Sequence, residues 1–261
     1  MQVRACQLGA DMGDATARLA AIRWLIIDAA SDGADVIVLP ELALTGYGAG
    51  DPIRDGAETV DGPVALELRR LADEHGITVV AGMALHHKDA LINAALIARP
   101  GKPPIVYAKQ HLYADYEKTM FAAGNAACEI FEVGGMKAGV LICFDVEFPE
   151  RVRELAKAGA QVIFVPTALP ASGSARMVAE YVVPTRAFES QVFIVYVDHV
   201  GTDERYTYQG LSCIAAPDGS RITVAPDDKP QMMSATLDPG DYAESIAANP
   251  YLAELALHRR P

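Results

Sequence analysis

Short apolar runs alternate with stretches of helical periodicity along the first third of the chain. Residues 3–8 and 36–39 are typical of buried strands, and between them residues 16–30 place apolar side chains at helical spacing. A strand, a helix and a second strand in this order form a βαβ unit. The pattern continues with a helix over 63–75, ended by Gly76, and with strands over 77–81 and 91–98. It therefore predicts the α/β fold class.

The second half of the chain repeats the first. Residues 33–40 read GADVIVLP and residues 159–166 read GAQVIFVP, each after a helical stretch. A helix and a strand then follow in both halves, and the turn at 97–101 has a counterpart at 214–219. Any two βαβ units share glycines and valines, but the ordered match favours a pseudo-two-fold repeat. We expect one domain over residues 1–261, with residues from about 240 to 261 as a docking or oligomer-contact arm.

Composition and charge exclude several classes of partner. The chain has 261 residues, 51% hydrophobic and 21% charged, which is typical of a compact globular protein. Its 22 basic and 34 acidic residues give a net charge of −12, which argues against nucleic acid or an anionic membrane as partner. The apolar runs are too short to span a membrane and the first residues lack a signal-peptide pattern, so we expect a cytoplasmic protein.

The four cysteines differ in their surroundings. They form no CxxC pair and match no histidine spacing, so we expect no disulfide framework, no metal and no cofactor. Cys6, Cys128 and Cys213 lie within strand-like runs, as small core residues do. Cys143 instead ends the apolar run 138–142 and precedes a helix, where backbone N–H groups lower a thiol pKa and can hold an oxyanion. Its position favours a nucleophile.

Two other strand ends carry charged side chains. Glu41 follows the strand 36–39, where burial would raise its pKa toward the range of a general base; a helix cap or an ion pair is the alternative. Lys109 ends the strand-like run 105–108, although a lone lysine is usually solvated, and Glu117 taken alone is a surface charge. Together with Cys143 these positions supply a base, a cation and a nucleophile, which is the minimum for acyl transfer through a thioester.

These motifs resemble those of the nitrilase, or carbon–nitrogen hydrolase, superfamily. The resemblance spans residues 1 to about 240 and rests on PEL at 40–42 with TGY at 45–47, on YAKQHL at 107–112 and on ICFD at 142–145. It implies a catalytic triad of Glu41, Lys109 and Cys143, with Glu117 as a second glutamate. It also implies a four-layer α-β-β-α sandwich that commonly pairs into dimers, so we expect a homodimer or a higher homo-oligomer that takes a small-molecule amide. The chain departs from the family at Phe144, where Tyr is frequent, and at Ser190 and Asp198, where Asn is common.

The expected activity is that of an amidase acting on a small aliphatic or amino-acid amide through a cysteine thioester. Glu41 would take the proton of Cys143, and Lys109 and the Phe144 N–H would hold the oxyanion. Asp145 and Glu147 would repel an anionic substrate and favour an amine-bearing one, unless they form structural hydrogen bonds with the helix start. The alternatives are an N-carbamoyl amine amidohydrolase, a nitrilase and a non-catalytic interaction module on this scaffold. The candidate substrate-binding residues are Phe144, Asp145, Glu147, Tyr47, Tyr113 and Thr167.

Overall fold

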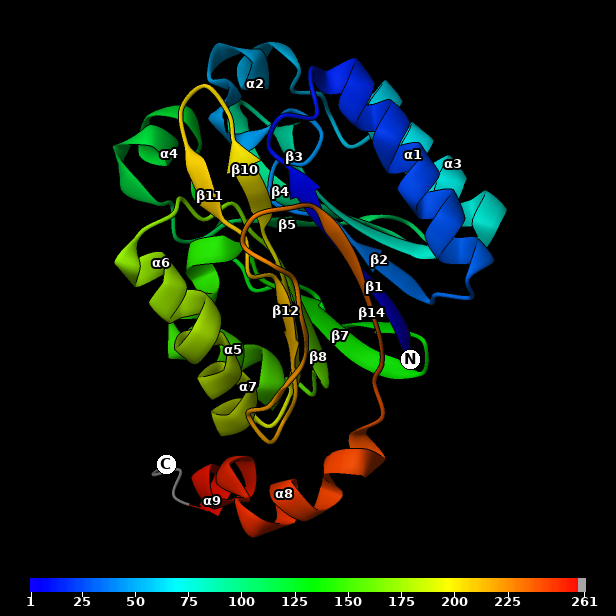
Figure 1. Cartoon of the computed structure of the whole chain (residues 1–261). Coiled ribbons are helices and arrows are strands. Elements are labelled where there is room, and N and C mark those ends of the chain that lie inside the picture. Colours follow the sequence, from blue (N-terminus) through cyan, green and yellow to red (C-terminus); the bar gives the residue numbers. More distant parts are fainter. Residues whose placement is uncertain (258–261) are drawn as a thin grey trace.

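The computed structural model describes residues 1–257 and contains two β-sheets that pack face to face between two layers of helices (Figure 1). Helices α1 (Ala15–Ser31) and α3 (Pro63–His75) cover the first sheet. Helices α5 (Pro149–Lys157) and α7 (Val183–Ser190) cover the second sheet. The four layers therefore follow the order α-β-β-α, and the predicted sandwich is confirmed.

The first sheet has the strand order β11-β10-β1-β2-β3-β4-β5, and β14 pairs with the other end of β1. Its strands are β1 (Gln2–Gly9), β2 (Val36–Val38), β3 (Thr78–His87), β4 (Ala90–Ala98), β5 (Ile105–Ala108), β10 (His199–Thr202), β11 (Thr207–Gln209) and β14 (Gln231–Thr236). Strand β2 is buried on both faces: Val36 and Val38 point to the core between the sheets, and Ile37 points to the core under α1 and α3. This double burial explains why its sequence is apolar without alternation.

The second sheet has the strand order β13-β12-β9-β8-β7-β6. Its strands are β6 (Phe131–Val133), β7 (Met136–Val140), β8 (Val162–Pro166), β9 (Phe193–Val197), β12 (Cys213–Ala215) and β13 (Arg221–Val224). The shorter helices are α2 (Asp51–Asp55), α4 (Ala114–Met120), α6 (Gly173–Met177), α8 (Ala243–Ala248) and α9 (Tyr251–Leu257). Single turns are the 3-10 helices η1 (Tyr47–Ala49), η2 (Cys143–Glu147) and η4 (Pro239–Tyr242) and the π-helix η3 (Val178–Val182).

The internal repeat predicted from the amino-acid sequence is present in the sheet topology. The path β14-β1-β2-β3-β4-β5 pairs in the senses antiparallel, parallel, parallel, antiparallel and antiparallel. The path β6-β7-β8-β9-β12-β13 follows the same senses in the same order. The similar segments 33–40 and 159–166 contain β2 and β8, which occupy equivalent central places. The first half thus supplies β1 to β5 and the helices over the first sheet. The second half supplies the second sheet and its helices, and adds β10, β11 and β14 to the first sheet.

Two elements extend or shift relative to the sequence expectation. Strand β3 runs on to His87 because its residues from Val79 to His87 pair with β4 across a tight turn in which Lys88 adopts φ +55°. Strand β7 ends at Val140, so residues 141–142 already belong to the connection that leads to η2. The predicted end of α3 is confirmed, since Gly76 has φ +65° and its N–H donates to Ala72 O.

The C-terminal arm lies against helix α7 of the same chain (Figure 1). The side chain of Gln191 donates to Ile246 O at 3.1 Å and accepts from Leu252 N at 3.0 Å. The rings of Phe188 and Tyr251 meet edge to face at 5.4 Å. Residues 258–261 of the expected arm lie outside the described residues. No helix within residues 1–257 combines the length and apolar character needed to cross a bilayer.

Candidate active site

The charged side chains predicted at strand ends meet in the interior of the sandwich. The ammonium of Lys109, which follows β5, donates to Glu41 Oε1 at 2.7 Å and to Glu117 Oε1 at 2.6 Å. All three side chains are fully buried. Lys109 thus neutralises part of the charge of two carboxylates that would otherwise repel each other. Glu117, which taken alone reads as a surface charge, is buried here because α4 turns it inward.

Cys143 and Glu41 lie on the two sides of a single residue, Ala168. The thiol of Cys143 faces Ala168 O, with a sulfur–oxygen distance of 3.9 Å. The N–H of Ala168 donates to Glu41 Oε2 at 2.9 Å. One peptide segment after β8 therefore contacts both the candidate nucleophile and the candidate base.

The turn at Cys143 has an uncommon backbone. Cys143 is the first residue of η2 and has φ +47°. This is a left-handed backbone conformation that residues other than glycine seldom adopt. Strain of this kind gathers at active sites, where surrounding contacts enforce it. The N–H of Phe144, the next residue, donates to no backbone carbonyl in the described residues. It is therefore available to a ligand, as an oxyanion donor must be.

Asp145 enforces that turn. Its Oδ2 accepts from Ile142 N at 3.2 Å and from the hydroxyl of Tyr107 at 2.8 Å. Its Oδ1 accepts from the backbone N–H of His111 at 2.9 Å and lies 2.8 Å from His111 Nδ1. Asp145 is fully buried, so all of these partners belong to the protein. The geometry favours a structural role for Asp145 over contact with a substrate. Its hydrogen bonds connect the turn at Cys143 to His111, in the segment after Lys109.

Glu41 has further partners that the sequence reasoning missed. Asn93 Nδ2 donates to Glu41 Oε1 at 2.6 Å, and His199 Nε2 lies 2.8 Å from Glu41 O. Burial lowers the pKa of His199 to about 4, so the ring is neutral and donates from Nε2. The sequence offered one signal for these two partners, which is their polarity. Asn93 is a polar residue within the apolar strand 91–98, and His199 closely follows another apolar strand.

Strand β3 passes close to the backbone of Glu41. A Cβ on Gly82 would lie 2.5 Å from Glu41 Cα, so only glycine permits this approach of β3.

Burial governs the protonation states of the site. It raises the pKa of Glu41 to about 7, against the opposing charge of Lys109, which agrees with the expected general base. Burial alone would lower the pKa of Lys109, but the negative charges of Glu41 and Glu117 oppose burial and the pKa is raised. Burial and Glu41 also raise the pKa of Cys143 well above its ordinary value. The expected lowering of that thiol pKa is wrong, because desolvation exceeds the effect of Lys109.

The remaining cysteines have the properties of core residues. Cys6, Cys128 and Cys213 are buried, and burial raises the pKa of each thiol to about 12. Such thiols carry almost no thiolate at neutral pH. Within residues 1–257, no group of three His, Cys, Asp or Glu side chains is placed to hold a metal ion.

Three of the candidate substrate-binding residues support the site in different ways. The hydroxyl of Tyr47 is buried and donates to Glu117 Oε1 at 2.8 Å. The backbone N–H of Tyr113 donates to Glu117 Oε2 at 2.9 Å. Thr167 is buried, and its carbonyl accepts from Glu41 N at 3.3 Å. Tyr47 and Thr167 therefore hold the two glutamates, whereas the ring of Tyr113 is exposed.

Aromatic rings surround the nucleophile turn. The ring of Phe144 meets Tyr113 at 5.3 Å and Phe148 at 5.0 Å, both edge to face. Phe148 also stacks on His111 at 3.9 Å. Phe144 and Phe148 are half-buried. Glu147, the last residue of η2, is half-buried as well, and Arg186 donates to its backbone oxygen at 2.8 Å.

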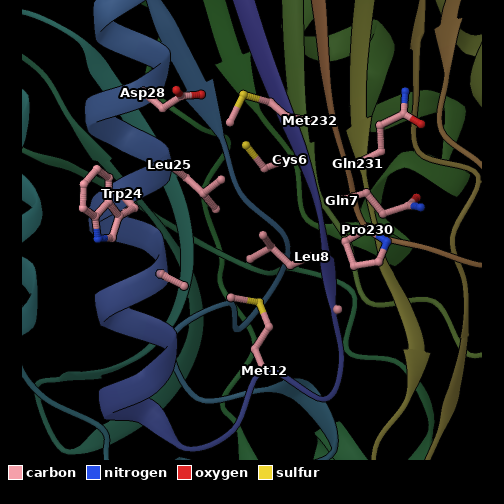
Figure 2. Close-up of a pocket in the computed structure, with 12 residues that line it drawn as sticks. Cys6, Gln7, Leu8, Met12, Trp24, Leu25, Asp28, Pro230, Gln231 and Met232 are labelled. Carbon is pink, nitrogen blue, oxygen red and sulfur yellow. The ribbon is translucent and has the colours of Figure 1, made fainter.

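A separate groove lies on the helix-covered side of the first sheet. Figure 2 shows it between α1 and the strands β1 and β14, with Trp24 and Leu25 on one side and Met232 on the other. Its cavity volume is about 580 Å³. None of the residues that line it belongs to the Lys109 cluster.

Known proteins are similar to this chain in sequence and in architecture. The family model described as carbon-nitrogen hydrolase matches residues 2–247. A protein described as a hydrolase in the pqqF 5′ region of Pseudomonas protegens is 40% identical, over 87% of this chain and 79% of its own length. A nitrilase of Pyrococcus abyssi is 35% identical, over 82% of this chain and 80% of its own. The amidase of Nesterenkonia sp. AN1, in a structure with butyramide, is similar with TM-score 0.82 and 26% identity, over 99% of this chain and 96% of that one.

Proposed function

This chain belongs to the carbon–nitrogen hydrolase, or nitrilase, superfamily, and from that premise we propose that it is an amidase that hydrolyses small linear amides to a carboxylic acid and ammonia. The observation that carries the proposal is the buried Lys109, which lies between Glu41 and Glu117 beside Cys143. The amide class is supported by the Nesterenkonia amidase, whose structure holds butyramide.

Acylation begins with a neutral thiol. Because the pKa of Cys143 is raised and that of Glu41 is about 7, the proton stays on sulfur until attack and then passes to Glu41. The sulfur bonds to the amide carbon, and the carbonyl oxygen becomes an oxyanion held by Lys109 and the Phe144 N–H. Glu41 then gives its proton to the amide nitrogen, the carbon–nitrogen bond breaks, and ammonia leaves a thioester on Cys143.

Deacylation uses the same groups with water as the nucleophile. Glu41 takes one proton of the water as its oxygen bonds to the thioester carbon, and the oxyanion forms at the same donors. Collapse breaks the carbon–sulfur bond, and the proton on Glu41 returns to the sulfur of Cys143. Glu117 keeps Lys109 protonated and in place throughout, because it accepts one of the ammonium hydrogen bonds.

The test is ammonia release by the purified protein and by Cys143→Ala, against matched amide, N-carbamoyl and nitrile forms of one short aliphatic chain. We expect release from the amide alone, lost in Cys143→Ala, with a thioester adduct on Cys143 seen by mass spectrometry during turnover. Cys213→Ala is the matched control, since that thiol is equally buried and lies outside the site. Release from the N-carbamoyl or nitrile form instead would overturn the amide assignment, and full activity in Cys143→Ala would overturn the mechanism.

A further inference from the structure

The carboxylate of Glu147 is exceptional among the acidic groups around the nucleophile. Glu41, Glu117 and Asp145 each accept hydrogen bonds from two or more protein groups. Within residues 1–257, the Glu147 carboxylate accepts none, and it takes part in none of the ion pairs. Glu147 is half-buried, and its carboxylate oxygens are not among the fully buried polar atoms that lack a partner, so they remain accessible. The carboxylate of Glu147 is therefore free to accept a hydrogen bond from a ligand.

The two cationic side chains that act on Glu147, those of Arg186 and Lys109, already form hydrogen bonds with other groups. Arg186 donates to the carbonyls of Val146 and Glu147 at 3.3 and 2.8 Å, and to Glu189 at 3.0 Å. Lys109 is held between the two buried glutamates. Burial raises the pKa of Glu147, and the charges of Lys109 and Arg186 only oppose this. Neither of the two cations that act on Glu147 within residues 1–257 is therefore free to pair directly with its carboxylate.

The position of Glu147 relative to the nucleophile limits what that cation can be. Cys143 and Glu147 are the first and last residues of η2, and a 3-10 helix rises about 2.0 Å per residue, so their Cα atoms are about 8 Å apart. A substrate that spans from the Cys143 sulfur to Glu147 therefore needs a chain of several atoms between its amide carbon and its charged group. The half-buried ring of Phe144 follows the nucleophile directly, and an aromatic face attracts a cation.

We infer that Glu147 forms an anionic subsite that binds the protonated amine of the substrate, so the substrate class is an aliphatic amide that carries an ammonium group at its far end. The inference rests on the proposed amidase function and names the substrate for the same site. Pairing with the ammonium supplies the partner that Glu147 lacks, and the surplus of negative charge on the protein attracts such a substrate. An amide ending in a carboxylate is rejected, because it would bring a second anion beside Glu147.

The experiment compares three amides of similar length: 5-aminopentanamide, hexanamide and the monoamide of glutaric acid. We expect the wild-type kcat/KM to be highest for 5-aminopentanamide and lowest for the glutaric monoamide. A hydrogen bond to a charged group is worth about 1.5–3 kcal/mol, so Glu147→Gln lowers kcat/KM for 5-aminopentanamide about 10- to 150-fold, mainly through KM. The same variant changes kcat/KM for hexanamide less than about threefold, because only the ammonium contact is lost.

Two further variants separate recognition from structure. Glu150→Gln removes an exposed carboxylate three residues away and leaves the ranking of the amides unchanged. Glu147→Arg reverses the preference toward the glutaric monoamide. Equal losses on all three amides in Glu147→Gln would show a structural role and overturn the inference, as would a wild-type enzyme that hydrolyses hexanamide as well as 5-aminopentanamide. In both cases Cys143-dependent release from hexanamide would leave the amidase function standing. No release from any amide would overturn the function and the subsite together.

Discussion

Replacing Asn93 by Ala should move the acid limb of the pH–rate profile without removing the catalytic groups. Asn93 Nδ2 donates to Glu41 Oε1 at 2.6 Å, and this bond favours the ionised carboxylate. The backbone carbonyl of Asn93, which accepts from Lys109 N at 2.8 Å, is kept in the variant. Asn93 Oδ1 has no partner, so the substitution leaves no new donor unpaired. The change therefore acts on the proton affinity of Glu41.

The size of the shift follows from the contact. A hydrogen bond to a charged group contributes about 1.5–3 kcal/mol, and one pKa unit corresponds to about 1.36 kcal/mol. Loss of the bond therefore raises the pKa of Glu41 from about 7 by roughly one to two units. Because the base must be ionised to accept the thiol proton, kcat/KM falls as the pH drops below this pKa. The loss at pH 6 is about 10- to 100-fold relative to wild type, and it fades as the pH rises above about 9.

The assay is kcat/KM for hexanamide between pH 5 and pH 10, measured by ammonia release. The neutral substrate keeps its charge over this range, so the acid limb reports the free enzyme. Thr78→Val is the matched control, since Thr78 is buried at the start of the neighbouring strand and is not among the described hydrogen-bond partners of the Glu41 carboxylate. An unshifted acid limb in the Asn93 variant, or a wild-type profile flat between pH 5 and pH 8, would refute the reasoning.

Three other substitutions test separate contacts. Lys109→Met leaves two buried carboxylates without their cation, so we expect a loss of about 3–5 kcal/mol of folding free energy, seen in thermal denaturation, and activity lower by at least about a hundredfold. Gly82→Ala forces the strand away from the catalytic glutamate and abolishes ammonia release, whereas Gly173→Ala, in open space, leaves kcat unchanged. Asp145→Asn weakens the nucleophile turn and lowers kcat on every amide alike, in contrast to the charge-dependent effect expected at Glu147; an effect on the ammonium substrate alone would contradict this.

The sequence predicted the parts of the site that follow strand ends. Apolar runs can be recognised in the sequence, and residues that follow such strands are common sites of chemistry, so Glu41, Lys109 and Cys143 could be named as candidates. The structure divides the strands that precede them between the two sheets. The repeat could be read because β2 and β8 are buried on both sides and tolerate few residue types. The Asn93 and His199 contacts to Glu41 were missed, because they join residues 52 and 158 positions apart. The sequence gives a side chain's place along its strand but not its partner.

The electrostatics of the nucleophile were misjudged for a related reason. A cysteine before a helix predicts a lowered thiol pKa, but the outcome depends on how deeply the fold buries it. Cys143 is 5% exposed and lies near Glu41, whose charge disfavours a thiolate. Likewise, Asp145 and Glu147 look equivalent in the sequence, yet the structure surrounds one with donors and leaves the other without them. Only the packing distinguishes the two carboxylates.

The internal repeat explains why the proposed catalytic centre lies between the two sheets. Residues 33–40 and 159–166 are equivalent, so Glu41 and Thr167, each the next residue after a strand-end proline, occupy matching positions. These equivalent residues meet: Glu41 N donates to Thr167 O at 3.3 Å, and the next N–H, that of Ala168, donates to Glu41 Oε2 at 2.9 Å. The ends of β2 and β8, one from each half of the chain, thus meet at Glu41 and Thr167. Only the first half carries a carboxylate there, and the second half supplies the backbone that orients it toward Cys143, so neither half alone contains a complete site.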